Sequence, residues 1–415
     1  MSINKPRKGN KKLQVNKGTT PAIFEYNHSM KILTVDIGTG TQDIFLYDSR
    51  LDIENGFKMV LPSPTMIVHR RIKAATLSRT PILLTGHQMG GGPSAWAAEA
   101  HAHAGLLVYA TEDAARTLDD ELKKVEAAGI KIVSEDEARR LPSEVIRLDL
   151  GDFDFGAISG TFGRFGISLR DLDAAVVAVF DHGAAPPGVS DRQFRFDNLD
   201  HCIRDKNTLS AFAYLSSEIP VSMTRLQSVA DSASGLDSPL IVMDTAPAAI
   251  LGATFDPVAA KRSHKLIANI GNFHTLAFKL GQNGIEGIFE HHTGEIDLPK
   301  LESLLRGLAN GSLKNEDVFN DMGHGALIYD HEPIKFGHDD FDVVVTGPRR
   351  SMFLGGGGAA PTLKPFFAAP FGDMMITGCF GMLAAAADVL PDLAKTIYGS
   401  MQNASARGTP PWDVE

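Results

Sequence analysis

Apolar and polar residues first form a clear pattern just after residue 30. Residues 32–36 predict a buried strand, residues 38–42 a tight turn rich in Gly and Thr, and residues 43–47 a returning strand, which together predict a β-hairpin. Residues 1–29 are basic and have no apolar run behind them, so we expect a disordered tail and not a secretory signal. Met30 stands directly before the first strand and marks a candidate natural start of the protein.

Strands and helices alternate between residues 82 and 148. Short apolar runs, the first at residues 82–84, are separated by stretches typical of helices. This order is typical of a parallel α/β sheet. A further strand is predicted over residues 174–180, and the polar stretch at residues 190–236 is expected to cross between two lobes.

The opening hairpin has a counterpart far along the chain. Residues 265–271 align with residues 32–38 when Asn269 is set against Asp36, and an apolar strand follows each turn. The two segments lie 233 residues apart, which indicates a duplicated domain rather than a solenoid with a short period. The expected parts are a tail at residues 1–29, a first lobe with an α/β insertion at 30–235, a second lobe at 236–400 and a flexible tail at 401–415.

Composition narrows the class of protein. Of the 415 residues, 43% are hydrophobic and 22% are charged, as is ordinary for a soluble globular protein with more than one domain. The net charge of -10 argues against general binding to nucleic acid or membrane, and no apolar run is long enough to span a bilayer. Cys202 and Cys379 stand alone, which argues against a disulfide framework and favours the reducing cytoplasm. We expect a small-molecule or protein partner.

The turn of the opening hairpin has the chemistry of a phosphate site. Glycine lets the backbone approach an anion closely, exposed N–H groups bind its oxygens, and a carboxylate at the end of a strand can hold a hydrated magnesium ion. Asp36 supplies the carboxylate, and the turn consists of Gly38, Thr39, Gly40 and Thr41. The alternative is a hairpin turn that binds no ligand.

Five segments resemble, in order along the chain, the motifs of the actin-like ATPase superfamily, which includes acetate and sugar kinases, Hsp70 and actin. Residues 35–41 resemble the first phosphate motif, residues 268–275 occupy the place of the second, and residues 343–348 resemble the adenosine motif. Residues 243–252 and 378–386 resemble the two connecting helices, whose small residues let them cross closely. The resemblance implies an α/β, duplicated ribonuclease H-like fold with two lobes and an interlobe cleft.

The same resemblance implies a site for ATP and magnesium in that cleft, closed by movement of the lobes. Asp36 would hold magnesium through water, and the candidates for catalysis are Asp36, Asp244 and His274. The residues expected to bind the nucleotide are Gly38, Thr39, Gly40, Thr41, Asn269, Gly271, Asn272 and Gly347.

Two residues depart from the superfamily's pattern. Asn269 stands where the second phosphate motif usually has an acid, and an amide neither acts as a base nor carries metal-binding charge. Pro348 removes a backbone donor from the adenosine motif. Slow turnover or nucleotide sensing is therefore an alternative to full catalysis, and specificity for adenine stays open.

Two further loops are candidate substrate sites. The Gly-rich residues 85–94 combine backbone donors with His87 and Gln88, while Asp181 and His182 close a predicted strand. A flexible loop and a solvated strand end are the alternative interpretations. The other histidines show no H-E-x-x-H spacing, so the sequence does not favour a dedicated transition-metal site.

The function expected from these features is hydrolysis of ATP or transfer of its γ-phosphoryl group to a small acceptor. The alternative is a nucleotide-gated activator or chaperone-like protein that acts on a partner enzyme with little turnover. The whole sequence is also similar to a prokaryotic family labelled pyruvate formate-lyase-activating-like. Two isolated cysteines cannot hold the iron–sulfur cluster of a radical S-adenosylmethionine activase, so we do not expect that chemistry.

Overall fold

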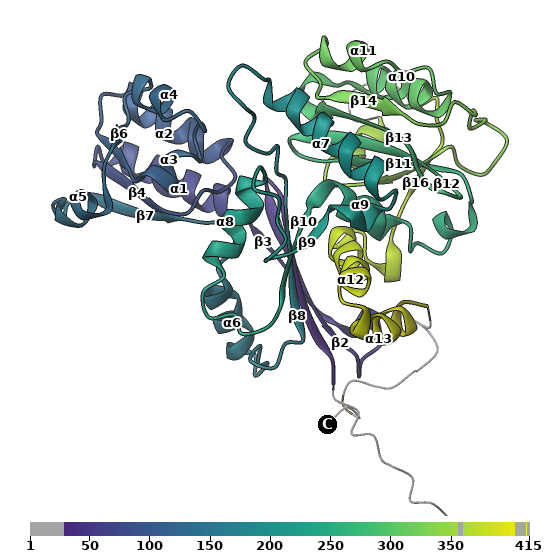
Figure 1. Ribbon diagram of the computed structural model, residues 1–415, viewed down its shortest axis with the longest axis horizontal. Helices are drawn as coiled ribbons and strands as arrows, with labels where there is room; N and C mark the ends of the chain where they lie inside the picture. The colour runs from purple at the N-terminus through teal and green to yellow at the C-terminus, as the bar shows by residue number, and fades with distance from the viewer. Residues whose placement is uncertain (1–28, 356–359, 403–411, 413–415) are drawn as a thin grey trace, which may run out of the picture.

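The computed structural model describes residues 29–355, 360–402 and 412, and these form two lobes with an α/β insertion on the first (Figure 1). Each lobe is built on a six-stranded sheet, and the insertion has a four-stranded sheet of its own. Nearly all of the tails expected at residues 1–29 and 401–415 falls outside the described residues.

The first sheet has the strand order β3-β2-β1-β8-β10-β9. β1, β2 and β3 form an antiparallel meander, whereas β1, β8 and β10 run parallel. Its central strands are buried on both faces: Ile32 packs into one core and its neighbour Leu33 into another. The bounds are β1 Lys31–Ile37, β2 Thr41–Asp48, β3 Phe57–Pro62, β8 Ala174–Val179, β9 Ala213–Leu215 and β10 Leu240–Asp244.

The second sheet has the order β14-β13-β12-β11-β15-β16 and repeats five strands of the first, whereas β9 and β14 have no counterpart in the other sheet. β11, β12 and β13 form the antiparallel meander, and β11, β15 and β16 run parallel. The repeat confirms the duplicated ribonuclease H-like fold, which the sequence shows only in one strand and one turn. The bounds are β11 Lys265–Ile270, β12 His274–Gly281, β13 Gly284–His292, β14 Gly325–Ile328, β15 Val343–Thr346 and β16 Pro365–Phe367.

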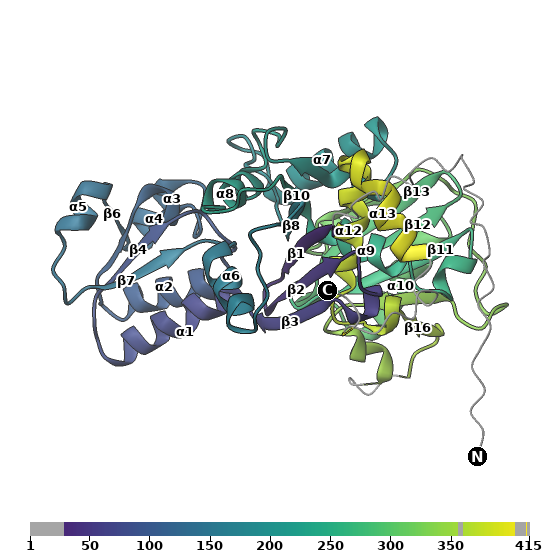
Figure 2. The same ribbon diagram turned by 90° about the horizontal axis from the view of Figure 1, so that it is seen from below.

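The insertion lies between β3 and β8 and projects from the first lobe (Figure 2). Its sheet is parallel, in the order β6-β5-β4-β7, as the alternation of strands and helices predicts. The bounds are α1 Pro64–Leu77, β4 Ile82–Gly86, α2 Pro93–His103, β5 Val108–Ala110, α3 Glu112–Ala115, α4 Leu122–Ala127, β6 Lys131–Ile132, α5 Glu135–Arg140 and β7 Ile146–Leu150.

Two helices cross at the junction of the lobes, α9 (Thr245–Ala253) and α12 (Thr377–Val389). A Cβ on Gly252 would collide with the carbonyl oxygen of Thr377, and one on Gly381 with that of Ala248. Glycine at these two positions is what lets the helix backbones touch, as the sequence predicts for the connecting helices.

The remaining helices cover the faces of the two sheets. α10, for example, buries its Leu side chains against the second sheet. Among the helices of the described residues, none combines the length and the hydropathy that crossing a bilayer requires. The bounds are α6 Phe155–Arg164, α7 Asp191–Asp205, α8 Thr224–Ser232, α10 Leu298–Ala309, α11 Asn315–Phe319 and α13 Pro391–Gln402.

The structure differs from the lobe boundary expected at residue 236, because the chain crosses between the lobes more often. β10 pairs with β8 in the first sheet instead of opening the second lobe. α12 also returns to the first lobe, where Cys379 and Phe380 share a core with Ile32 and Phe45. α7, in contrast, packs on the second sheet. An apolar run shows that a strand or helix is buried, but not which of two similar sheets it joins.

Candidate functional site

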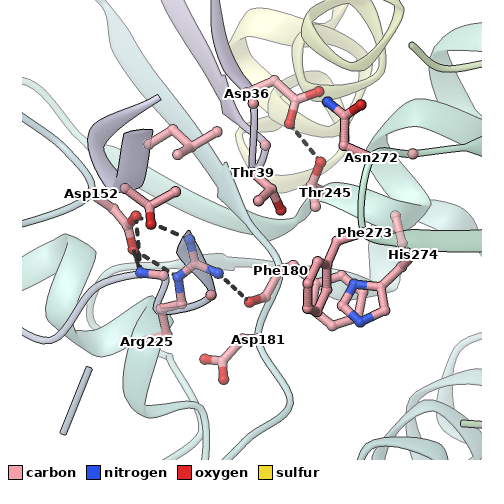
Figure 3. A pocket seen from close by; sticks show the side chains of 18 of the residues that line it. Asp36, Thr39, Asp152, Phe180, Asp181, Arg225, Thr245, Asn272, Phe273 and His274 are labelled. Atoms are coloured by element: carbon pink, nitrogen blue, oxygen red, sulfur yellow. Dashed lines mark hydrogen bonds and ion pairs between the residues drawn. The ribbon is translucent and has the colours of Figure 1, made fainter. Parts of the chain in front are cut away.

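A cleft of about 410 Å³ lies where the two sheets and the insertion meet. Figure 3 shows side chains from all three parts pointing into it. Loops that follow the ends of strands line most of its wall, as is usual for ligand sites in α/β folds. These segments are residues 36–41, 88–92, 116–120, 180–183, 271–274 and 346–348.

The turns of the two hairpins have the same geometry and face each other across the cleft. Gly38 N donates to Thr41 O and Gly271 N donates to His274 O, each at 2.9 Å. A Cβ on Gly40 would lie 2.6 Å from Nδ2 of Asn272, on the opposite turn. Glycine at position 40 therefore leaves the space that the Asn272 amide occupies.

Asp36 lies near the end of β1 and lines the cleft, beside Thr245 and Asn272 (Figure 3). Its carboxylate accepts a hydrogen bond of 2.6 Å from Thr245 Oγ1, and it touches the first turn of α12 so closely that a Cβ on Gly378 would collide with it. Burial raises the pKa of Asp36 to about 6. The hydrogen bond from Thr245 lowers this pKa, and the nearby charge of Asp244 raises it further. The carboxylate is thus held where added positive charge would stabilise its ionised form.

Asp43 lies directly opposite Asp36 in the hairpin and also lines the cleft. Burial and the charge of Asp36 raise the pKa of Asp43 to about 7. Its Oδ1 is buried and finds no hydrogen-bond partner within the described residues. Two neighbouring carboxylates, one with an unused oxygen, form a site that favours a cation.

The loop after β15 forms another end of the cleft. Gly347 has a φ of +98°, and a Cβ there would collide with the side chain of Asn269. Arg350 NH1 donates to the carbonyl oxygen of Gly347 at 2.9 Å, and Met374 and Met375 line the same region. This part of the cleft therefore combines a glycine backbone that a ligand can approach closely with two apolar side chains and one guanidinium group.

Aromatic rings occupy the wall on the side of the second hairpin. The ring of Phe180, directly after β8, stacks on His274 with the centroids 4.1 Å apart. Phe273 of the turn lies 5.8 Å from the exposed ring of Trp96, which belongs to the insertion. The second turn thus contacts the insertion as well as its own lobe.

The Gly-rich loop after β4 is held in place by an ion pair (Figure 3). Arg225 donates to Asp152 at 2.7 and 3.0 Å and to Phe180 O at 2.7 Å. Gly90 N also donates to the Asp152 carboxylate, and a Cβ on Gly90 would lie 2.5 Å from the Arg225 guanidinium. Gln88 O accepts from Ser228 Oγ at 2.6 Å. The loop is therefore anchored at the cleft, in contrast to the flexible-loop alternative.

The structure brings together most of the side chains that the sequence singles out. Every residue predicted to bind the nucleotide lines the cleft, as do Asp36, His274, Gln88, Asp181 and His182. His87 is not among the lining residues. The carboxylate of Asp181 is already engaged by two backbone donors, Gly183 N at 2.8 Å and Leu226 N at 2.9 Å.

Asp244 is placed differently from the catalytic role predicted for it. It lies outside the cleft lining, begins α9 as its N-cap and accepts from Arg195 NH1 at 2.6 Å. Arg195 also donates to Glu290 at 2.8 Å, and all three side chains are buried. A carboxylate engaged in this way positions Arg195 and α9, which argues against its acting as a base.

The lining residues that sequence reasoning misses include Asp43, Phe180, Arg225 and Thr245. Two of them carried a usable signal: Asp43 is the partner of Asp36 in a hairpin of predicted register, and Thr245 follows Asp244 at the start of a predicted helix. Arg225 gave none, since its partner Asp152 lies 73 residues away.

The repeated sheet, the crossing helices and the cleft between them define a two-lobed protein of the actin-like ATPase fold. The chain belongs to a family described as "Putative pyruvate format-lyase activating enzyme (DUF1786)", whose model matches residues 89–352. No curated protein matches the chain in sequence.

Solved structures similar to this chain share little sequence with it. They include an activator of the 2-hydroxyisocaproyl-CoA dehydratase from Clostridium difficile with bound ADPNP (10% identity, 88% of this chain and 97% of that chain covered, TM-score 0.34). MreB5 of Spiroplasma citri bound to ADP has 11% identity, with 90% and 99% of the chains covered and a TM-score of 0.29. An ROK hexokinase from Thermus thermophilus has 12% identity, with 91% and 88% covered and a TM-score of 0.21.

Proposed function

We propose that this protein binds ATP with magnesium in the interlobe cleft and hydrolyses it or transfers its γ-phosphoryl group to a small acceptor. The observation that carries the proposal is the pair of matching turns that face each other, with Gly40 of one against Asn272 of the other. Opposed turns present backbone N–H groups from two sides, and such an arrangement suits the oxygens of a polyphosphate.

The residues present fit a nucleotide and its metal ion. The turns at residues 38–41 and 271–274 would hold the phosphates, and Gly347 with Met374 and Met375 would hold the nucleoside. Asp36 and Asp43 would hold hydrated magnesium, because both carboxyls have a raised pKa and Asp43 has a buried oxygen to spare. When bound, the ion would neutralise charge on the phosphates.

We place the acceptor in the part of the cleft that is lined by Gln88, Asp119 and Asp120 together with the anchored Gly-rich loop. Polar and acidic groups here fit a hydroxylated or cationic molecule better than a second anion. Cys202 and Cys379 form no disulfide, which fits a reducing compartment, and we propose the cytoplasm.

A second candidate function is a nucleotide-gated activator of a partner enzyme. Two observations favour it. Asn269 deprives the second hairpin of an acid, and the edge strand β3 exposes apolar side chains, among them Phe57 and Val60 at 38% and 43%. The family description also names an activating enzyme. Turnover in the absence of a partner distinguishes this candidate from a kinase or ATPase.

Calorimetric titration with magnesium ATP tests the shared step, nucleotide binding. Asp36→Asn should weaken binding about 100-fold, equivalent to about 2.8 kcal/mol. The matched control is Asp171→Asn, since Asp171 pairs with Lys31 at the opposite end of the same strand and touches no cleft residue. Absence of binding to the wild-type protein would refute the proposal, as would equal binding by Asp36→Asn.

A further inference from the structure

Three histidines from distant parts of the chain converge beside the cleft. His182 follows β8, His274 is the first residue of β12 and His324 directly precedes β14. One ring nitrogen from each lies within 4.8 Å of those of the other two. The Nε2 atoms of His182 and His324 are 3.0 Å apart, close to the roughly 3.3 Å expected for two nitrogens bound to one tetrahedral Zn²⁺.

The cluster leaves a nitrogen atom without a partner. His274 Nε2 is buried and makes no hydrogen bond to any described residue. Buried polar atoms are normally paired, so this unpaired nitrogen beside two further imidazole rings calls for an explanation. The hydrogen bond between the Nε2 atoms of His182 and His324, and the stacking of their rings at 23° from parallel, explain why these two lie together but not the unused nitrogen of His274.

A carboxylate lies beside the cluster, next to the ring nitrogen of His324 that does not face His182. Glu290 Oε1 lies 3.4 Å from Nδ1 of His324. A carboxylate on the far nitrogen of a metal-binding histidine orients the ring and leaves its Nε2 free for the ion. Since Arg195 pairs with both Glu290 and Asp244, this buried group of three carries a formal charge of minus one, which would offset part of the ion's charge.

We propose that His182, His274 and His324 form a site for a single transition-metal ion, of the kind that takes Zn²⁺ or Co²⁺. Of the residues assigned above to the nucleotide or to magnesium, this site uses only His274, the last residue of the second turn. Imidazole nitrogens suit these ions, and three protein ligands leave at least one coordination position open.

The open position would face the cleft. His182 and His274 line the cleft, whereas His324 is fully buried behind them. Phe180, stacked on His274, fills the space on one side. A metal ion here would bind water or an anionic oxygen of a ligand in the cleft, and its chemistry would be that of a Lewis acid. His274 would then be a ligand and not a base.

The test uses full-length protein without a histidine tag, stripped of metal and free of nucleotide. It is titrated with Co²⁺, followed by absorption of the bound ion, and with Zn²⁺ by calorimetry. The expected result is one ion per chain, with affinity reduced at least about 100-fold in His182→Gln and in His324→Gln. The control is His292→Gln: the His292 ring lies 4.7 Å from that of His324, but its Nδ1 is engaged with Met322 O at 2.7 Å.

Circular dichroism separates loss of the site from loss of the fold. If His324→Gln does not fold, His182→Gln decides the question, since His182 lies in a loop and is only partly buried. No stoichiometric binding by the wild-type protein, or equal binding by the wild type and by the folded variants, would overturn the proposal. Failure of magnesium ATP to bind would leave this result unaffected, because the ion is tested alone.

Discussion

The two hairpins of this protein are alike in backbone and opposite in chemistry. In each, a glycine directly follows a strand, and its N–H donates to the carbonyl oxygen three residues later, at 2.9 Å. The pair Asp36 and Asp43 of the first hairpin corresponds in register to the pair Asn269 and Leu276 of the second. The first hairpin keeps two acids, and the second has an amide and a leucine.

The difference indicates a division of tasks between the lobes. The first hairpin concentrates negative charge beside small residues, which suits a metal ion and close-approaching phosphates. The second turn carries Asn272, Phe273 and His274, which contact Gly40, the insertion and the histidine cluster. The two turns therefore share one geometry and differ in the side chains that they present.

The largest effect is expected from filling the space between the turns. Gly40→Val would displace the Asn272 amide, so we expect the affinity for magnesium ATP to fall about 100-fold, or about 2.8 kcal/mol. The Cβ of the new valine would meet only the end of the Asn272 side chain and no backbone atom, so the fold should persist. Calorimetry measures the loss, and Gly40→Val combined with Asn272→Gly should recover part of the affinity.

Gly160→Val is the control for this substitution. Gly160 is exposed on α6, and a Cβ there would meet nothing within 4 Å. The control should bind magnesium ATP as the wild type does. If Gly40→Val also binds normally, the turns do not form one phosphate site.

A smaller effect is expected when the missing acid is restored. Asn269→Asp should raise the rate of ATP hydrolysis about tenfold, because a carboxylate can accept a proton from the attacking water and an amide cannot. Phosphate release at saturating magnesium ATP measures the rate. Asn55→Asp, an exposed change on the first lobe, is the control. A rate that stays unchanged while binding is intact would favour the activator function.

The fold was predictable because its signals are local and ordered. The strand and turn at residues 32–38, the later copy at 265–271 and the small residues of both connecting helices each follow from a short stretch of sequence. The assignment of β10 and α12 to the first lobe did not follow, because it depends on which sheet a buried segment meets.

The cleft was predictable only in part, for the same reason. Residues inside a motif, such as Asp36 and Gly271, were found, whereas the pairing of Arg225 with Asp152 and the meeting of His182 and His274 with His324 were not. His182 and His324 lie 142 residues apart and meet only after both lobes have folded. Spacing along the chain predicts a metal site only when its ligands lie in one helix or one loop. The three histidines of this cluster come from three separate segments.

The two acids of the first hairpin should also make stability depend on pH. The folded state keeps the proton of Asp43 up to about pH 7, whereas an unfolded Asp loses it near 3.8. Stability of the metal-free protein should therefore fall as pH rises from about 4 to 7. Asp43→Asn removes this loss, so we expect the variant to match the wild type near pH 4 and to exceed it at pH 8 by roughly 1–2 kcal/mol, discounted for partial exposure.

Urea unfolding at both pH values, without magnesium, checks this prediction. Asp171→Asn gives a control of opposite sign, because Lys31 lowers the pKa of Asp171 and the aspartate form is the stabilising one. Parallel pH profiles for the wild type and Asp43→Asn would contradict the prediction.

The smallest expected effect is optical and concerns the second turn. The chain has two tryptophans: the ring of Trp96 lies 5.8 Å from that of Phe273, and Trp412 is 80% exposed near the C-terminus. In Trp412→Phe protein, closure around magnesium ATP should shift the emission of Trp96 slightly to the blue, because the half-exposed ring loses water. Adding Phe273→Leu should abolish most of the shift, whereas Phe165→Leu, a change of an exposed ring elsewhere, should not. An equal shift in both variants would mean that the second turn takes no part in closure, and the division of tasks between the hairpins would then rest on the first hairpin alone.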